Sequence, residues 1–144
     1  MSRLFEELDY QPTPMGALSL RRRRDLSLGI DIYEIKLGDE FLMSSVCTAS
    51  EMALARIGLA ELSTDSLEVV VGGLGLGYTA RTVLDDARVK SLLVIEAMPE
   101  VIEWHENGLL PLGTQLSSEP RCQLVVGDFF AMLTSSPTGF DPEG

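Results

Sequence analysis

Cysteine, histidine and tryptophan are scarce in this 144-residue sequence, which holds two cysteines, one histidine and one tryptophan. Cys47 and Cys122 lie far apart and form no Cys-x-x-Cys spacing, so we expect two buried, reduced thiols rather than a disulfide or a zinc site. The single histidine, His105, belongs to no pattern of a partner acid and a nucleophile, and we expect it and Trp104 to be packing residues. Nothing in this pattern indicates a metal centre.

Positive charge and long apolar runs are also scarce. The 11 basic residues face 22 acidic ones, which gives a formal net charge of −11 and argues against nucleic acid or an anionic membrane as the main partner. No apolar run approaches the roughly 18 residues of a membrane span. The charged N-terminus does not resemble a secretory signal. We therefore expect a cytoplasmic protein that acts on a small molecule.

The run from Arg21 to Arg24 is the one basic cluster. It could bind an anion or an acidic partner surface, or it could be the solvated end of a strand. The second interpretation is favoured, because successive side chains on a strand point to opposite faces and so divide the charge.

A packed core is expected, since 45% of the residues are hydrophobic and 23% are charged. Two prolines and a glycine predict an irregular stretch over residues 1–16. Alternating apolar residues then predict a small antiparallel sheet, with a tight turn at Gly38-Asp39 and strands at residues 17–23, 30–37 and 40–44. We assign this sheet to an N-terminal segment, residues 1–47.

Residues 48–144 alternate between apolar strands and amphipathic helices, which predicts an α/β domain with a parallel sheet. Val69 to Val71 read as a strand that is buried on both faces. The predicted elements are a helix at 48–62, a strand at 69–71, a helix at 79–87, a strand at 91–96, a helix from Pro99, a loop at 109–120, a strand at 122–126 and a short helix ending near residue 133.

Glycines at 72, 73, 75 and 77 follow the first of these strands. Lacking Cβ, they permit a sharp turn that can come close to a ligand, ahead of the free N–H groups of a helix. Glu96 ends the next strand and Asp128 follows the third, so Gly73, Glu96 and Asp128 should meet at the carboxyl edge of the sheet, where such folds bind ligands. The alternative is a solvent-facing strand end for Glu96 and a helix N-cap for Asp128, which could cap and bind at once.

Two ligand classes fit this pattern. Gly75-Leu-Gly77-Tyr-Thr-Ala80 matches the G-x-G-x-x-A fingerprint of nicotinamide dinucleotide sites, but it starts late after the strand and leaves Gly72 and Gly73 unexplained. Gly73, Gly75 and Gly77 match the G-x-G-x-G of S-adenosylmethionine sites. There, Glu96 would accept hydrogen bonds from the ribose hydroxyls and Asp128 from the adenine amino group. Tyr78 is expected to pack, or to border the ligand.

The sequence resembles the spermidine synthases, the polyamine aminopropyltransferases. The resemblance covers roughly residues 30–133 and is carried by Asp39-Glu40-Phe41, Ser50-Glu51-Met52, Val70-Val71-Gly72-Gly73-Leu74-Gly75-Leu76-Gly77, Val94-Ile95-Glu96-Ala97, Val101-Ile102 and Val125-Val126-Gly127-Asp128-Phe129-Phe130. It implies a Rossmann-like, methyltransferase-type fold, decarboxylated S-adenosylmethionine as donor, a polyamine acceptor and a homo-oligomer.

The sequence departs from the family pattern at three places. Gly75 stands where the family usually has an aspartate, and Ala49-Ser50 stand where it has a Tyr-His pair. The family's catalytic aspartate follows a fourth strand, which Phe140-Asp141 only approach, so we expect a truncated sheet and name no catalytic residue. The polyamine half of the site is thus absent or altered.

Our leading hypothesis is a transferase that binds S-adenosylmethionine or its decarboxylated form and alkylates an amine or another nucleophile. The alternatives are a methyltransferase, a non-catalytic nucleoside-binding remnant and an NAD-dependent oxidoreductase. We also expect the strand at 68–71 to form an open edge of the sheet, so that this chain, made alone, self-associates and catalyses no transfer.

Overall fold

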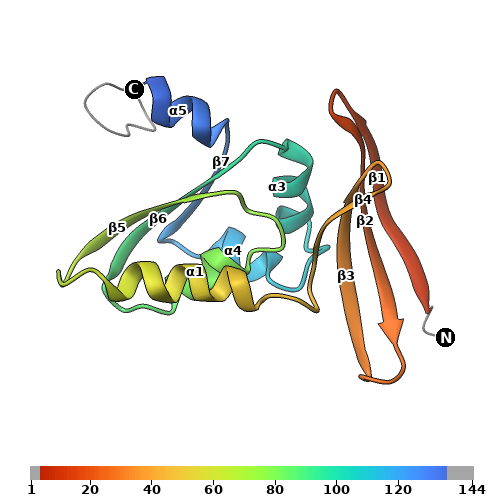
Figure 1. The fold of residues 1–144 in the computed structure, drawn as a ribbon, viewed down its shortest axis with the longest axis horizontal. Helices are drawn as coiled ribbons and strands as arrows, with labels where there is room; N and C mark the ends of the chain where they lie inside the picture. Colours follow the sequence, from red (N-terminus) through yellow and green to blue (C-terminus); the bar gives the residue numbers. More distant parts are fainter. Residues whose placement is uncertain (1–3, 136–144) are drawn as a thin grey trace. The chain divides into compact units, whose positions relative to one another are not determined.

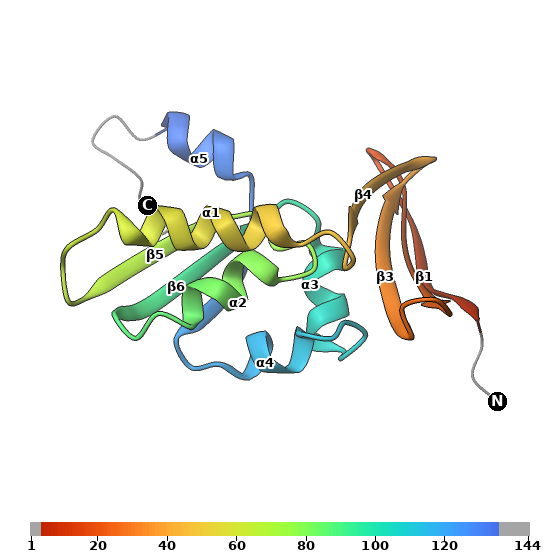
Figure 2. The same ribbon diagram turned by 60° about the horizontal axis from the view of Figure 1, so that its bottom comes forward.

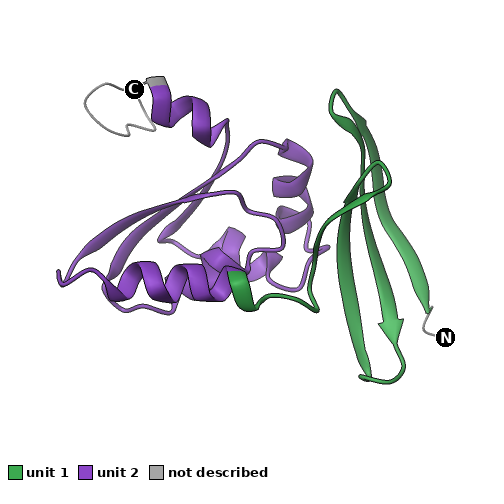
Figure 3. Ribbon diagram, in the orientation of Figure 1, with its two compact units in different colours: residues 1–50 green, residues 51–144 purple. Residues whose placement is uncertain are grey.

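The computed structural model describes residues 4–135. The chain forms two compact units, residues 1–50 and residues 51–144, which are coloured separately in Figure 3. Within residues 4–135, no helix has both the length and the apolar character needed to cross a membrane.

The first unit is a four-stranded antiparallel meander in the order β1-β2-β3-β4 (Figure 1). Its strands are β1 (Phe5–Thr13), β2 (Gly16–Asp25), β3 (Ile30–Leu37) and β4 (Glu40–Ser44). The last three strands and the turn at Gly38, where φ is +61°, confirm the prediction.

The expectation that residues 1–16 are irregular is wrong, because β1 occupies most of that stretch. β1 pairs with β2 from Phe5↔Arg23 to Thr13↔Gly16, and Pro12 lies near the hairpin end of this edge strand. A proline at an edge can point its N–H-deficient side away from the pairing partner, so it costs no ladder hydrogen bond there. The pairing with β2 therefore overrides the local breakers.

Each arginine of the cluster forms an ion pair with an acidic residue of the first unit. Arg21 and Arg23 each place Nε 3.0 Å from Oε1 of the buried Glu34. Arg22 and Arg24 lie 3.4 Å and 3.3 Å from Asp31 Oδ1. The predicted division between opposite faces is confirmed, because Arg21 and Arg23 share one acidic partner and Arg22 and Arg24 share another. The arginine side chains are 18–39% exposed and share three carboxylates, so the strand end is solvated as favoured, and its ion pairs balance only part of the positive charge.

The second unit is an α/β domain, as predicted, built on a parallel sheet in the order β5-β6-β7 (Figures 1 and 2). Its elements are α1 (Ala49–Ala60), β5 (Leu67–Gly72), α2 (Tyr78–Leu84), β6 (Val89–Glu96), α3 (Pro99–Glu106), α4 (Gly113–Ser118), β7 (Cys122–Val126) and α5 (Phe129–Ser135).

Two local predictions in this unit are wrong. The stretch at 109–120 contains the helix α4, whose Gly113 and Leu116 are buried, so packing stabilises a turn of helix that the glycine and prolines seemed to exclude. Helix α2 ends at Leu84 instead of residue 87, and Ala87 is exposed in the turn that follows the helix.

The centre and the edge of the parallel sheet differ in burial. On β6, Leu92, Val94 and Ile95 are at most 1% exposed, whereas Val70 on β5 is 36% exposed. The predicted edge position of β5 is confirmed within the described sheet, and the prediction that this strand is buried on both faces is wrong. Three consecutive valines indicate a strand, but its neighbours decide how much of it is covered.

Two arginines near the amino-terminal ends of the strands donate hydrogen bonds to backbone carbonyls of neighbouring segments. Arg88 donates to the carbonyls of Leu59 (2.9 Å) and Leu62 (2.6 Å), at the end of α1. Arg121 donates to the carbonyls of Leu84 (2.9 Å) and Val89 (3.1 Å). These contacts satisfy carbonyls that helix ends and loops leave open. They fix the end of the sheet opposite to the glycine turn.

Candidate functional site

The turn between β5 and α2 contains Gly73, Gly75 and Gly77 with φ values of +104°, +50° and +92°. No non-glycine residue in the described part of the chain has a positive φ. Side chains rarely adopt this region, so the backbone itself explains the three glycines. Gly73 is exposed, whereas Gly75 and Gly77 are buried.

The turn uses its N–H groups internally. Gly73 N–H donates to the Ile95 carbonyl (2.8 Å), and Gly77 N–H donates to the Leu74 carbonyl (2.8 Å). Leu74 and Gly75 both donate to Glu96 Oε1, at 3.0 Å and 3.3 Å. An anion could bind these four groups only by breaking bonds that already exist.

Glu96 lies at the end of β6, where the sequence placed it. Its Oε1 accepts the two bonds from the turn, and its Oε2 accepts a third from Met98 N–H at 3.0 Å. A carboxylate offers about four lone pairs, so one acceptor position remains for a ligand. The half-buried Glu96 therefore organises the turn and can still accept from a hydroxyl group.

Asp128 follows β7 and caps α5. Its Oδ1 accepts from Ala131 N–H at 3.1 Å, which is the N-cap geometry that the sequence left open. The residue is exposed, and Phe129 and Phe130 follow it. Capping uses one carboxylate oxygen, so it is compatible with a second role.

Three of the predicted site residues, Gly73, Glu96 and Asp128, line a single hollow of about 160 Å³ at the carboxyl edge of the sheet. Its other lining residues are Gly72, Ile95, Ala97, Gly127, Phe129 and Phe130. Ligand pockets usually measure roughly 300–1,000 Å³, so this hollow can enclose only part of a nucleoside. Gly75 and Gly77 do not line it, although Gly75 reaches it through its bond to Glu96.

Two phenylalanines in this hollow were given no role from the sequence. The rings of Phe129 and Phe130 meet edge to face, with centroids 5.8 Å apart. Phe129 lies so close to Gly72 that an added Cβ would come within 2.6 Å of its ring. Phe130 is 77% exposed. Gly72, which neither glycine fingerprint explains, is thus accounted for by the packing of α5.

His105 was expected to be a packing residue, and the structure also gives it a hydrogen bond to the glycine turn. The imidazole is fully buried, and its Nε2 lies 2.7 Å from the Gly75 carbonyl oxygen. Burial lowers the pKa of His105, against the opposing effects of the Gly75 bond and of the Glu96 charge. No signal in the sequence joins residues 75 and 105, because the contact depends on how α3 packs beneath the turn.

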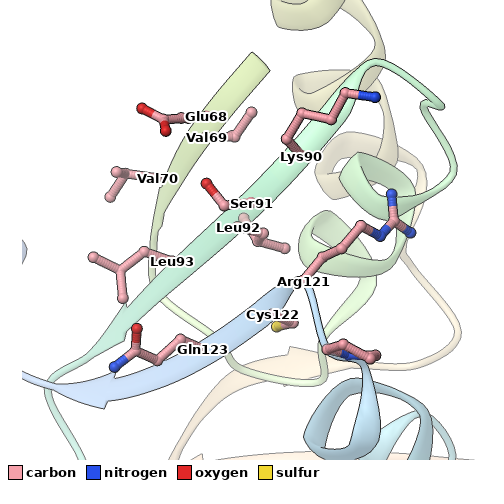
Figure 4. Close-up of a pocket in the computed structure, with 11 residues that line it drawn as sticks. Glu68, Val69, Val70, Lys90, Ser91, Leu92, Leu93, Arg121, Cys122 and Gln123 are labelled. Carbon is pink, nitrogen blue, oxygen red and sulfur yellow. The ribbon is translucent and has the colours of Figure 1, made fainter. Parts of the chain in front are cut away.

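A larger hollow of about 700 Å³ lies along the three strands and includes Glu68, Lys90, Ser91, Arg121 and Gln123 (Figure 4). We give it less functional weight than the smaller hollow. It lies toward the amino-terminal ends of the strands, whereas parallel sheets bind ligands beyond the carboxyl ends. Arg121 in this hollow is already bonded to Glu119 and to two carbonyls.

The cysteines and the potential metal ligands add no residue to the candidate site. Both cysteines are free. Cys47 is exposed, which corrects the expectation that it is buried, and burial raises the pKa of the Cys122 thiol to about 11. Among residues 4–135, no group of histidine, cysteine or acidic side chains has the arrangement of a metal site. Phe140 and Asp141, the expected approach to a fourth strand, lie outside the described residues.

No family model matches the sequence, and no curated protein matches it. Solved structures do match. The spermidine synthase of Thermotoga maritima superposes with a TM-score of 0.67 at 18% identity, over 85% of this chain and 40% of that one. A spermidine synthase in complex with the transition state analogue AdoDATO superposes with a TM-score of 0.68 at 20% identity, over 85% of this chain and 41% of that one.

The chain thus spans about two fifths of the length of the enzymes it matches. At 18–20% identity, the match shows the fold alone. The described chain therefore has a spermidine synthase-like fold, with the glycine turn, Glu96 and Asp128 at the carboxyl edge of its parallel sheet.

Proposed function

We propose that this chain binds the nucleoside part of S-adenosylmethionine or of decarboxylated S-adenosylmethionine. The observation that carries the proposal is the position of Glu96, bonded to the glycine turn and sharing one hollow with Gly73 and Asp128. In this arrangement, Glu96 accepts from the ribose and Asp128 from the adenine amino group. Gly73, Gly75 and Gly77 shape the turn that passes the sulfonium end.

The same contacts favour a nucleoside over a dinucleotide. A pyrophosphate needs free N–H donors at the turn. Here the N–H groups of Gly73, Leu74, Gly75 and Gly77 are bonded within the protein, and two of them already donate to the carboxylate of Glu96. An NAD-dependent oxidoreductase therefore fits the site less well.

We further propose that the chain belongs to a transferase that alkylates a small nucleophile, with a polyamine as the leading acceptor. The fold supports this, and so does the complex of one similar structure with AdoDATO. A non-catalytic nucleoside-binding module is the second candidate. It is supported by the three backbone N–H bonds that Glu96 accepts, which give this acid a structural role that requires no catalysis.

Calorimetry on the 144-residue chain tests ligand binding, with 5′-methylthioadenosine, S-adenosylmethionine, its decarboxylated form and NADH as probes. We expect the adenosyl compounds to bind and NADH not to bind. Glu103→Ala, which removes an exposed acid from α3, is the matched control for Glu96→Ala. Binding of NADH alone, or equal effects of the two variants, would contradict the proposal. Turnover with putrescine and the decarboxylated donor would reject the binding module and also contradict the expectation that this chain alone catalyses no transfer.

We also propose that the chain forms a homo-oligomer through the edge of β5. An apolar groove of about 500 Å³ runs beside this strand, lined mainly by α1, β5 and α2. An exposed edge of β-branched residues favours pairing with another strand. Val70→Lys should shift sedimentation toward the monomer, and an unchanged distribution would reject the β5 edge as the interface.

A further inference from the structure

The glycine turn is held from two sides by two side chains far apart in the sequence. On one side, Glu96 Oε1 accepts from the N–H groups of Leu74 and Gly75, at 3.0 Å and 3.3 Å. On the other side, His105 Nε2 lies 2.7 Å from the Gly75 carbonyl oxygen. Gly75 thus donates to β6 through its N–H and accepts from α3 through its carbonyl.

The tautomer of His105 follows from these partners. A carbonyl oxygen only accepts, so Nε2 must carry the proton for the 2.7 Å contact to be a hydrogen bond. Nδ1 is buried without a hydrogen-bond partner. An unpaired buried N–H costs more than an unpaired lone pair on a ring nitrogen, so Nδ1 is unprotonated and the ring is neutral. A neutral imidazole agrees with the lowered pKa of this residue.

The ring also shapes the end of the turn. A Cβ added to Gly77 would lie 3.2 Å from His105 Cε1 and 2.5 Å from Leu116 Cδ1. The imidazole therefore contacts the turn at two of its three glycines, by a hydrogen bond at Gly75 and by packing at Gly77. Removing the ring would release the Gly75 carbonyl and leave a gap below Gly77.

We propose that His105 is a positioning residue for the adenosyl site, which holds the Gly75 carbonyl so that the N–H groups of Leu74 and Gly75 face Glu96. The effect on ligand affinity rests on the proposed function above. The hydrogen bond of His105 sets the orientation of the turn, and the turn sets the orientation of the carboxylate that accepts from the ribose. His105 itself is fully buried and does not line the hollow.

Two substitutions separate the hydrogen bond from simple packing. His105→Gln keeps an N–H donor near the position of Nε2, whereas His105→Leu keeps apolar volume and removes the donor. Ile102→Val, at another buried position of α3, is the control for a loss of packing away from the turn. Melting temperatures of the three variants measure the packing loss of each.

The first readout needs no ligand. Amide hydrogen exchange at Leu74 and Gly75 should accelerate about fivefold to tenfold in His105→Leu, the factor expected for the loss of one net hydrogen bond, and should stay near the parent value in His105→Gln and Ile102→Val. Long-range ¹⁵N–¹H spectra of the parent should show a protonated Nε2 and an unprotonated Nδ1. A protonated Nδ1, or equal exchange in the Leu and Gln variants, overturns the proposal.

The second readout is calorimetry with 5′-methylthioadenosine. His105→Leu should bind about fivefold to tenfold more weakly than the parent, and His105→Gln should restore most of the loss. Equal weakening in both variants, in proportion to their melting temperatures, means a structural role alone and rejects positioning. If the parent does not bind the nucleoside, the proposed function fails, while the exchange experiment still decides whether His105 holds the turn.

Discussion

The ends of β6 and β7 each place a carboxylate at the same edge of the sheet, and the two carboxylates have different surroundings. Glu96 is half-buried and accepts three backbone N–H bonds, two of them from the glycine turn. Asp128 is exposed and accepts one bond, from the helix it caps. The acid at the end of β6 is thus bonded to a neighbouring turn, whereas the acid after β7 is bonded to the helix that follows it.

This difference shows that equivalent positions in a repeating strand–helix pattern need not be equivalent in the site. The turn, Glu96 and His105 form one connected group, because each is bonded to the next. Asp128 joins that group only by lining the same hollow. Substitutions in the connected group should therefore affect stability and binding together, and substitutions at Asp128 should affect them separately.

The largest expected effect is that of Gly77→Ala. The new Cβ would lie 2.5 Å from Leu116 Cδ1, at a φ of +92° that alanine rarely adopts, so strain and overpacking add. We expect a loss of about 2–4 kcal/mol in the free energy of unfolding by urea. Gly73→Ala is the control, with a similar φ of +104° and nothing within 4 Å of its Cβ, and should cost about 1–2 kcal/mol. Equal losses would mean that packing against α4 contributes nothing.

Glu96→Ala should come next. It removes the acceptor of three backbone N–H groups, so we expect both a lower melting temperature and a loss of about 1–3 kcal/mol in adenosyl binding by calorimetry. Unchanged affinity with lower stability would leave Glu96 as an organiser of the turn and remove it from the ligand site.

The pH dependence should isolate His105, the single histidine of the chain. Its pKa is lowered from 6.5 by burial, so the folded state binds fewer protons than the unfolded state just below that pH. The contribution of neutral His105 to the free energy of unfolding is therefore complete above pH 6.5. It decreases as the pH drops from there toward the lowered pKa. Glu96, the charged group facing the ring, reduces this effect.

Carboxylates with lowered pKa values change the free energy of unfolding only at a lower pH than His105 does. Asp86, whose pKa Arg88 lowers from 3.8 to about 2, and Glu119, lowered from 4.5 by Arg121, lose their contribution below those ordinary values. Urea titrations between pH 7 and pH 5 should therefore slope in the parent and be nearly flat in His105→Gln. The same slope in both proteins would assign it to other groups.

The smallest effect is expected at Asp128. Asp128→Ala removes the cap of α5 and should cost about 1 kcal/mol, whereas Asp128→Ser keeps an oxygen that can cap. Calorimetry on the serine variant then isolates binding. If this variant recovers stability and still binds the nucleoside weakly, Asp128 contacts the ligand. Full recovery of both leaves it as a cap only.

The sequence predicted the α/β class, the strands around Val69, Val94 and Leu124, and the positions of Glu96 and Asp128 at the carboxyl ends of strands. Those features are local, because apolar runs, glycine positions and spacing along the chain specify them. The roles of these residues toward a ligand stay predictions. The errors at β1 and α4 have a common cause, since each element contains breakers that a neighbouring strand or a buried face overrides.

By itself, the sequence determined that three glycines follow an apolar strand and that acids follow the next two strands. The tertiary structure alone decided that Phe129 occupies the space beside Gly72, and that Leu116 and His105 add a packing reason to the positive φ of Gly77. It also decided that Glu96 and His105 both bond to the same turn, one to the Gly75 N–H and the other to the Gly75 carbonyl. The physical reason is that backbone preferences act between neighbours in the chain. A hydrogen bond between residues 75 and 105 exists only once α3 has packed beneath the turn and excluded water from both partners.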